Sequence, residues 1–170
     1  MLMKMKAAGW PKDFVWDGSA IKILDKVDSA FSNVERPVYF TDVNHCSECR
    51  EHHDELSARP RMELQRSDLG DCGWDPLCFT SAEGIAYLFP LLARYSMAPS
   101  FWPDHDWYGD RLAFHLTYEE QGNRFYRSCN STQRSAVAGM IAWITENRTD
   151  EIELYFSDDE WLHAWRVWSA

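Results

Sequence analysis

The sequence predicts a mainly α-helical fold in one compact domain of about five helices, or an α+β fold with a small minor sheet. Apolar residues recur every three to four positions in several segments, whereas the alternation typical of strands is scarce. The 170 residues, 45% of them hydrophobic, suffice for one domain with its own core and are too few for two. We therefore expect a single domain over residues 1–170, with residues 1–18 as a loosely attached N-terminal arm.

The first predicted helix begins near Ser19, a suitable N-cap, and ends before Arg36 and Pro37, because the residue before a proline disfavours the helical conformation. Residues 37–41 are then extended or form a short strand. Within the first predicted helix, the apolar residues that recur at helical spacing are Ile21, Leu24, Val27, Phe31 and Val34.

A second helix is predicted from His45 to Leu56, a segment without Gly or Pro, and Pro60 closes it. A third helix follows the sequence Thr80-Ser-Ala-Glu83, which matches a capping box, and Pro90 is expected to kink it. The apolar residues of this third helix are Ile85, Leu88, Phe89, Leu92 and Tyr95.

Two more helices are predicted near the C-terminus. Ser131 or Thr132 can cap the first of them, and residues 152–156 read as a short extended segment or the start of a turn. Residues 157–160 match another capping box and open the terminal helix. Among the apolar residues of the first, third and fourth helices, those expected in the core are Leu24, Phe31, Leu88, Leu92, Ile141 and Ile144.

The charge balance excludes some classes of partner. Against 27 acidic residues stand 17 Lys and Arg, a net charge of −10, so the average field repels phosphate backbones and anionic membrane surfaces. We expect neither nucleic acid nor membrane as a partner, but another protein with a basic surface. The sequence shows no signal peptide and no transmembrane segment.

The five cysteines are odd in number and unevenly spaced. In a chain without an export signal, such thiols are more often free, reactive or metal-bound than paired. The sequence therefore predicts a cytoplasmic protein.

The segment from His45 to Asp54 is rich in Cys and His. On a helix, Cys46, Cys49 and His53 share one face, whereas His45, Cys49 and His52 share a neighbouring one. Thiolates combined with imidazole favour zinc.

A fourth ligand can come from the loop that follows, which contains Cys72 and Cys78. We take Cys46, Cys49, His53 and Cys78 as the predicted zinc ligands. Two alternatives stay open: cysteines packed as small apolar residues, and a Cys46-x-x-Cys49 dithiol that cycles with a disulfide.

Two motifs resemble a family of small bacterial proteins of unknown function. The first is His45-Cys46-x-Glu48-Cys49 followed by His53-Asp54, and the second is Trp74-Asp75-Pro76-x-Cys78-Phe79-x-Ser81-x-Glu83-Gly84. Together with the first predicted helix, the likeness spans roughly residues 20–95. The resemblance implies a bacterial origin and Cys and His residues that lie together, but it implies no reaction.

Other candidate sites lie in aromatic and acidic segments. Asp104, His105 and Asp106 can bind a hard metal or act as an acid/base pair, or can form a solvated loop. Tryptophans at 161, 165 and 168 share one face of the terminal helix, where they either pack on the core or bind a partner. The proline-bounded loop is expected to be exposed, and its candidate partner-binding residues are Trp102, Trp107 and Tyr108.

These observations favour a small acidic binding protein, for example an immunity or inhibitor protein that neutralises a protein toxin or effector. No complete catalytic motif is present, so a non-enzyme is the first hypothesis. The alternative is a zinc-dependent or thiol enzyme built on residues 45–54, with Glu48 or Asp54 as general base.

Overall fold

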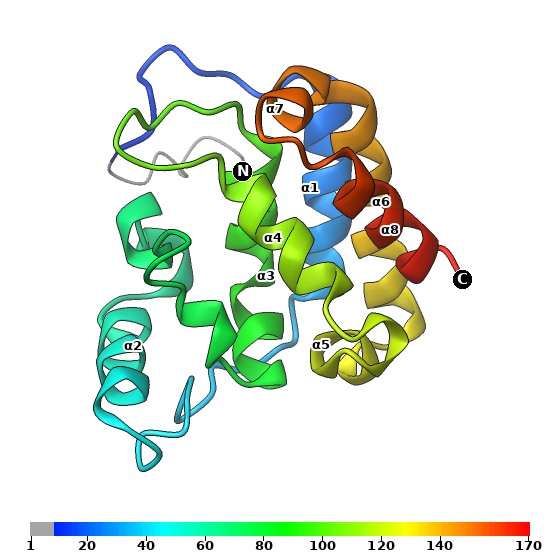
Figure 1. Cartoon of the computed structure of the whole chain (residues 1–170). Helices are drawn as coiled ribbons and strands as arrows, with labels where there is room; N and C mark the ends of the chain where they lie inside the picture. The colour runs from blue at the N-terminus through cyan, green and yellow to red at the C-terminus, as the bar shows by residue number, and fades with distance from the viewer. Residues whose placement is uncertain (1–8) are drawn as a thin grey trace.

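The computed structural model describes residues 9–170, which fold into helices joined by loops and short 3-10 turns (Figure 1). Within this range the only β pairing is an isolated bridge between Asp71 and Trp74. The mainly α prediction is therefore confirmed. The α-helices are α1 (Gly18–Ala30), α2 (Ser47–Ser57), α3 (Ala82–Met97), α4 (Tyr108–Thr117), α5 (Arg124–Ser128), α6 (Ser131–Asn147), α7 (Thr149–Leu154) and α8 (Asp158–Trp168). The 3-10 turns are η2 (Arg61–Glu63), η3 (Arg66–Leu69), η4 (Pro76–Cys78) and η5 (Glu120–Gly122).

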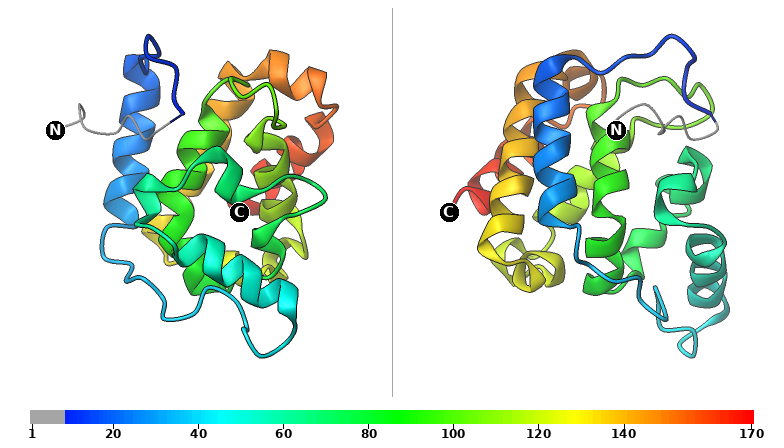
Figure 2. Two further views of the ribbon diagram at one scale, coloured as in Figure 1. Left: turned by 90° about the vertical axis from the view of Figure 1, so that its left-hand side faces the viewer. Right: turned by 180° about the vertical axis from the view of Figure 1, so that it is seen from behind.

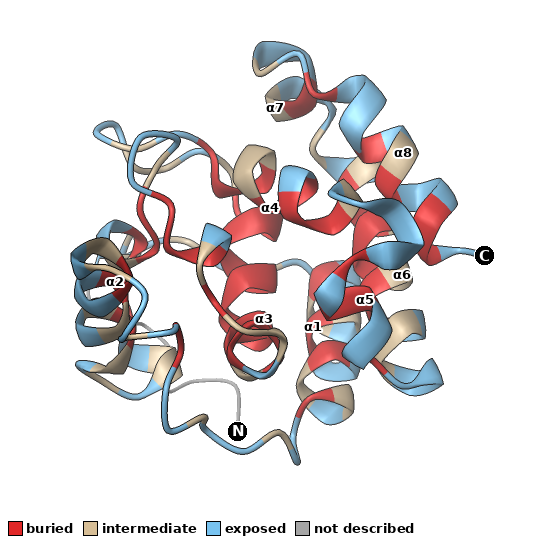
Figure 3. Cartoon of the chain, turned by 60° about the horizontal axis from the view of Figure 1, so that its bottom comes forward, coloured by how far each residue is buried: buried red, intermediate tan, exposed pale blue. Residues whose placement is uncertain are grey.

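Helix α3 is the centre of the domain. Helices α1, α4, α5 and α6 pack against it, and α8 covers α4 and α6 (Figures 1 and 2). Between Gly84 and Met97 every residue except Tyr87 is buried, as the red ribbon of α3 in Figure 3 shows. Helix α2 lies at the edge of the domain, against η3 and η4. The six residues predicted for the core are all buried, which confirms the assignment of the core-forming helices.

The predicted helix starts are close to the observed ones, but other residues cap them. Asp17, not Ser19, caps α1, and its Oδ1 accepts the backbone N–H groups of Ser19 and Ala20 at 2.7 and 2.9 Å. At α3 the hydroxyl of Ser81, not that of Thr80, accepts the N–H of the third helical residue. Several residues near the start of each helix can act as its N-cap. The conformation of the preceding backbone determines which of them accepts the first free N–H groups.

The caps of the two longer C-terminal helices agree with the prediction only in part. Asn130, one residue before the predicted caps, opens α6 through a reciprocal capping box with Gln133. Ser157 stands at the start of α8 as predicted, but its side chain makes no capping hydrogen bond.

Helices α4, α5 and α7 differ from the prediction. Residues 152–156 were predicted to be extended or to start a turn; residues 149–154 form helix α7, and residues 155–156 are a turn. Helices α4 and α5 were not predicted. Residues 37–41, predicted as extended or as a short strand, form a loop without a strand. Helix α7 has six residues and α5 has five, which is too short for a helical period to be visible.

The N-terminal segment is attached through aromatic side chains. Trp10 stacks on Tyr95 of α3 with ring centroids 5.2 Å apart and contacts Trp102, while Phe14 contacts Phe101. Of the arm predicted for residues 1–18, residues 1–8 lie outside the described residues, and residues 10–14 lie against the domain.

Among the described helices, none combines the length and the apolar character that a bilayer crossing requires.

Candidate functional site

Three potential metal ligands converge where α2 begins. Cys46 is the N-cap of α2, and its Sγ accepts the backbone N–H of Cys49 at 3.3 Å. The Sγ atoms of Cys46 and Cys49 are 3.3 Å apart, and Nδ1 of His45 lies 3.4 Å from Sγ of Cys49. One ligand atom from each residue lies within 4.8 Å of the others. We call His45, Cys46 and Cys49 the thiol cluster.

The loop before α2 is held by its own hydrogen bonds. Asp42 accepts the N–H of Asn44 through Oδ1 and that of His45 through its carbonyl, both at 3.0 Å. Arg50 donates to the carbonyl of Val43 at 2.9 Å, and the hydroxyl of Thr41 donates to the carbonyl of Cys49. The loop therefore presents His45 to the two sulfurs in a defined position.

The two thiols differ in environment. The hydrogen bond from the backbone N–H of Cys49 lowers the pKa of Cys46, with smaller contributions from the side chains of Cys49 and His45. Burial raises the pKa of Cys49, and the neighbouring sulfur of Cys46 raises it further. Cys46 is half-buried and Cys49 is buried. Cys46 is thus the more acidic and more accessible thiol of the pair.

The other two histidines of this segment point elsewhere. Nδ1 of His53 accepts the backbone N–H of Phe40 at 3.2 Å. The ring of His52 is fully buried between Trp74 and Phe79, with ring centroids 4.3 and 5.2 Å away. The predicted ligand His53 is thus replaced by His45, because the helix begins at residue 47 and leaves His45 in the preceding loop.

Cys78, predicted as the fourth ligand, lies with Asp75 and His115 instead of with the thiol cluster. The four predicted ligands therefore do not form one set in the described part of the chain. The five cysteines are all free, with Cys72 and Cys78 exposed and Cys129 buried.

The acidic loop around His105 forms an anchoring network. Nδ1 of His105 lies 2.7 Å from Oδ2 of Asp71, and the buried Arg66 donates to Oδ1 of Asp71 at 2.7 Å and to the carbonyl of Asp106 at 2.8 Å. His105 pairs with Asp71, far away in the sequence, and not with its neighbour Asp104. This network connects the loop to η3.

The expectation that Trp107 and Tyr108 are exposed is wrong, since each is 1% exposed. Nε1 of Trp107 donates to the carbonyls of Ser96 and Ala98 at 3.1 and 2.9 Å. These carbonyls lie in the last turn and at the C-cap of α3, where helical partners are missing, so the indole has a structural role. Trp102 is half-buried and donates to the carbonyl of Gly9 at 3.2 Å.

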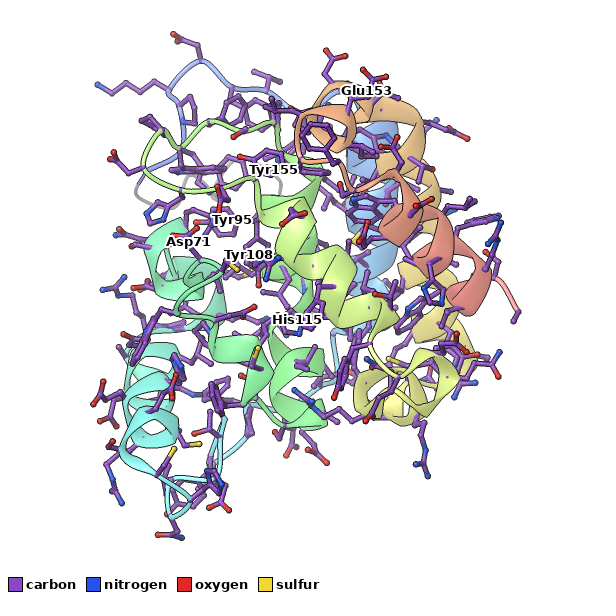
Figure 4. The ribbon with its side chains drawn as sticks, viewed as in Figure 1. Asp71, Tyr95, Tyr108, His115, Glu153 and Tyr155 are labelled. Carbon is purple, nitrogen blue, oxygen red and sulfur yellow. The ribbon has the colours of Figure 1, made fainter. Side chains whose placement is uncertain are left out.

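A groove with a volume of about 370 Å³ is lined by residues of helices α6, α7 and α8. We call it the α6–α8 groove. Glu153, labelled on α7 in Figure 4, belongs to its rim. The residues that line the groove are Ala142, Thr145, Glu146, Thr149, Ile152, Glu153, Asp158, Trp161, Leu162 and Trp165.

No protein-family model matches the chain, and neither the curated proteins nor the solved structures yield a similar protein.

Proposed function

We propose that this chain is a small acidic binding protein, of the immunity or inhibitor kind, that receives a basic protein partner in the α6–α8 groove. The observation that carries the proposal is the chemistry of the lining. Three exposed carboxylates, of Glu146, Glu153 and Asp158, surround apolar side chains, and none of the described lining residues is Lys or Arg. This local charge has the sign of the whole chain, whose net charge is −10.

The apolar part of the groove offers contact area to a partner. Trp165 is 42% exposed and Leu162 is 46% exposed, although both belong to a helix whose other face packs on the core. Tryptophan is enriched among the residues that contribute most to protein–protein affinity. The three tryptophans predicted to share one face of the terminal helix therefore differ. Trp161 and Trp168 are buried in the domain, and Trp165 is open to a partner.

The turn between α7 and α8 supplies a further apolar side chain. Phe156 is 88% exposed and has a φ of 54°. The left-handed conformation is unfavourable for an aromatic residue, and here no burial of the ring compensates for it. This turn exposes a phenyl ring beside the N-terminus of α8. An exposed aromatic ring at this position supports a contact with another protein.

The partner that fits best is an amphipathic helix with leucine-like residues on one face and Lys or Arg beside them. A groove between helices accepts such a segment through spaced apolar anchors. The carboxylates on the rim would pair with the basic residues and accelerate association.

The test uses a fluorescent synthetic peptide, a basic amphipathic helix of leucine and lysine, and measures its binding by anisotropy. We expect saturable binding that weakens with salt, and a loss of at least tenfold, about 1.4 kcal/mol, for Trp165→Ala. Glu153→Gln should reduce the salt dependence.

Two variants serve as matched controls. Tyr118→Ala removes a 52% exposed aromatic ring outside the groove, and Glu35→Gln removes an exposed carboxylate far from it in the sequence. Both should bind the peptide as the wild type does. Absence of binding to the wild type, or equal affinities for Trp165→Ala and Tyr118→Ala, would overturn the proposal.

A cytoplasmic location belongs to this proposal. Five free thiols, two of them exposed, support it, since exposed thiols persist in a reducing compartment.

A zinc-dependent or thiol enzyme at the thiol cluster is the second candidate function. It is supported by the convergence of His45, Cys46 and Cys49 within 4.8 Å. Two thiolates and one imidazole suit zinc, and a site with three protein ligands keeps a fourth position for water or substrate. The same two sulfurs, 3.3 Å apart, would alternatively form a disulfide by exchange with a substrate disulfide.

Metal content and thiol state distinguish these alternatives. Elemental analysis of protein purified under reducing conditions should give one zinc fewer for Cys46→Ser than for the wild type, whereas Cys72→Ser should keep the wild-type zinc content. A wild type with the same zinc content as Cys46→Ser that forms a Cys46–Cys49 disulfide with oxidised glutathione would support thiol exchange instead. Thiols that neither bind zinc nor oxidise would contradict both.

A further inference from the structure

The second motif of the sequence leads to a site that lies outside the proposed functions. Asp75 and Cys78 stand at the two ends of η4, and His115 comes from α4, 37 residues after Cys78. One ligand atom from each of the three lies within 4.8 Å of the others. Figure 4 shows His115 on the side of α4 that faces η4.

The carboxylate and the imidazole are fixed before any ion binds. Nε2 of His115 lies 2.8 Å from Oδ2 of Asp75, and the side chains are only 8% and 6% exposed. The other carboxylate oxygen, Oδ1, accepts the N–H of Leu77 at 3.1 Å. The two groups therefore have little freedom to turn away from each other.

The surrounding backbone is held as firmly. The guanidinium of Arg124 donates to the carbonyls of Leu77 and Thr80 at 2.7 and 3.0 Å, on either side of Cys78. Asn123 donates to the carbonyl of His115 at 2.8 Å. Neighbouring residues thus position both elements of the site, as the outer shell of a metal centre does.

The helix that carries His115 also carries a buried polar atom without a partner. Tyr108 precedes His115 by two helical turns on α4 and is 1% exposed, and its hydroxyl has no hydrogen-bond partner among the described residues. Burial raises the pKa of Tyr108, and the charge of Asp75 raises it further. A buried hydroxyl without a partner is costly, and a water carried by an ion bound at Asp75 is a partner of the kind that it lacks.

We propose that Asp75, Cys78 and His115 form a site for a zinc-type transition metal ion, separate from the thiol cluster. One sulfur, one nitrogen and one oxygen ligand favour zinc over magnesium or calcium, which prefer oxygen alone. The exposed Cys78 gives the ion access, while the buried pair supplies rigid ligands. Three protein ligands leave one tetrahedral position for water or a small anion.

The experiment replaces zinc by cobalt, whose bond to a thiolate gives an absorption band in the near ultraviolet. The protein carries Cys46→Ser and Cys49→Ser, so that the thiol cluster cannot contribute to the signal. Titration with Co²⁺ should still produce the band with one equivalent. Adding Cys78→Ser should abolish it, and His115→Gln should weaken cobalt affinity by more than about 100-fold, since even outer-shell partners contribute 10–100-fold.

The chain offers a matched control for each substitution. Cys72→Ser removes an exposed thiol from the same loop, and His105→Gln breaks a His–Asp pair with a distance of 2.7 Å to which no sulfur is joined. Neither should change the band. No band in the protein without Cys46 and Cys49, or equal affinities for His115→Gln and His105→Gln, would overturn the second site. Both results leave the zinc test of the thiol cluster unaffected.

Discussion

The sulfur of Cys46 accepts the backbone N–H of Cys49, so the first cysteine of the pair is also the cap of α2. A serine hydroxyl can accept the same hydrogen bond, whereas alanine cannot. We expect Cys46→Ala to lower the free energy of unfolding by about 0.5–2 kcal/mol and Cys46→Ser to leave it near the wild-type value. Guanidinium titration measures both. Equal losses for the two variants would show that the hydrogen bond does not stabilise the helix.

Leu88 lies on the central helix α3 and is fully buried. Leu88→Ala should lower the free energy of unfolding by about 2–5 kcal/mol, because it leaves a cavity that the surrounding helices cannot fill. The control is Leu154→Ala at a leucine that is 69% exposed, which should change stability by less than about 0.5 kcal/mol. A loss under about 1 kcal/mol for Leu88→Ala would place α3 outside the stabilising core.

Gly109 lies directly against the ring of Trp107. A Cβ added at Gly109 would stand 2.2 Å from Cζ2 of that ring, which two hydrogen bonds to the end of α3 hold in place. We expect Gly109→Ala to cost about 1–3 kcal/mol and to change the near-ultraviolet circular dichroism of tryptophan. Gly139→Ala, in α6, meets nothing closer than 3.9 Å and should stabilise the protein by about 0.5–1 kcal/mol. Destabilisation by both would refute the steric argument.

Asp71 makes the free energy of unfolding of the domain depend on pH in the acidic range. Burial raises the pKa of Asp71, but the hydrogen bond to His105 and the charge of Arg66 together outweigh burial, so the pKa lies below its usual value. The resulting stabilisation is complete above the unfolded-state pKa of about 3.9 and is lost as the pH falls through the folded-state value. Denaturant titrations from neutral to acidic pH should therefore show a smaller loss of stability for Asp71→Asn than for the wild type. Parallel pH profiles would contradict this.

The sequence predicts the long helices well, because their apolar faces repeat over several turns and match the buried faces of α1, α3 and α6. It does not reveal α4. The residue before that helix, Trp107, offers no side-chain acceptor as a cap. Trp107 itself also shows how composition misleads: a proline-rich loop is usually exposed, yet this indole supplies the donor that the carbonyls at the end of α3 require.

For the candidate sites, spacing along the chain identifies only local pairs. Cys46 and Cys49 are brought together by one turn of helix, as predicted. His115 meets Asp75 only because α4 packs on α3 beside η4, and no periodic pattern records a contact between residues 40 positions apart. The position of the first helical residue, 47, decides between His45 and His53, and helix ends are the least certain part of a sequence-based assignment.

Helix α2 lies at the edge of the domain, and this position determines how the buried groups of the helix become accessible. Because α2 packs mainly on the short turns η3 and η4, we expect it to detach while the remaining helices keep their core. In amide hydrogen exchange, α2 should then exchange through local opening, whereas α3 should exchange only when the whole domain unfolds. Each such opening uncovers the sulfur of Cys49 and the imidazole of His52, so the reactivity of these buried groups reports the breathing of one helix and not the global stability of the protein.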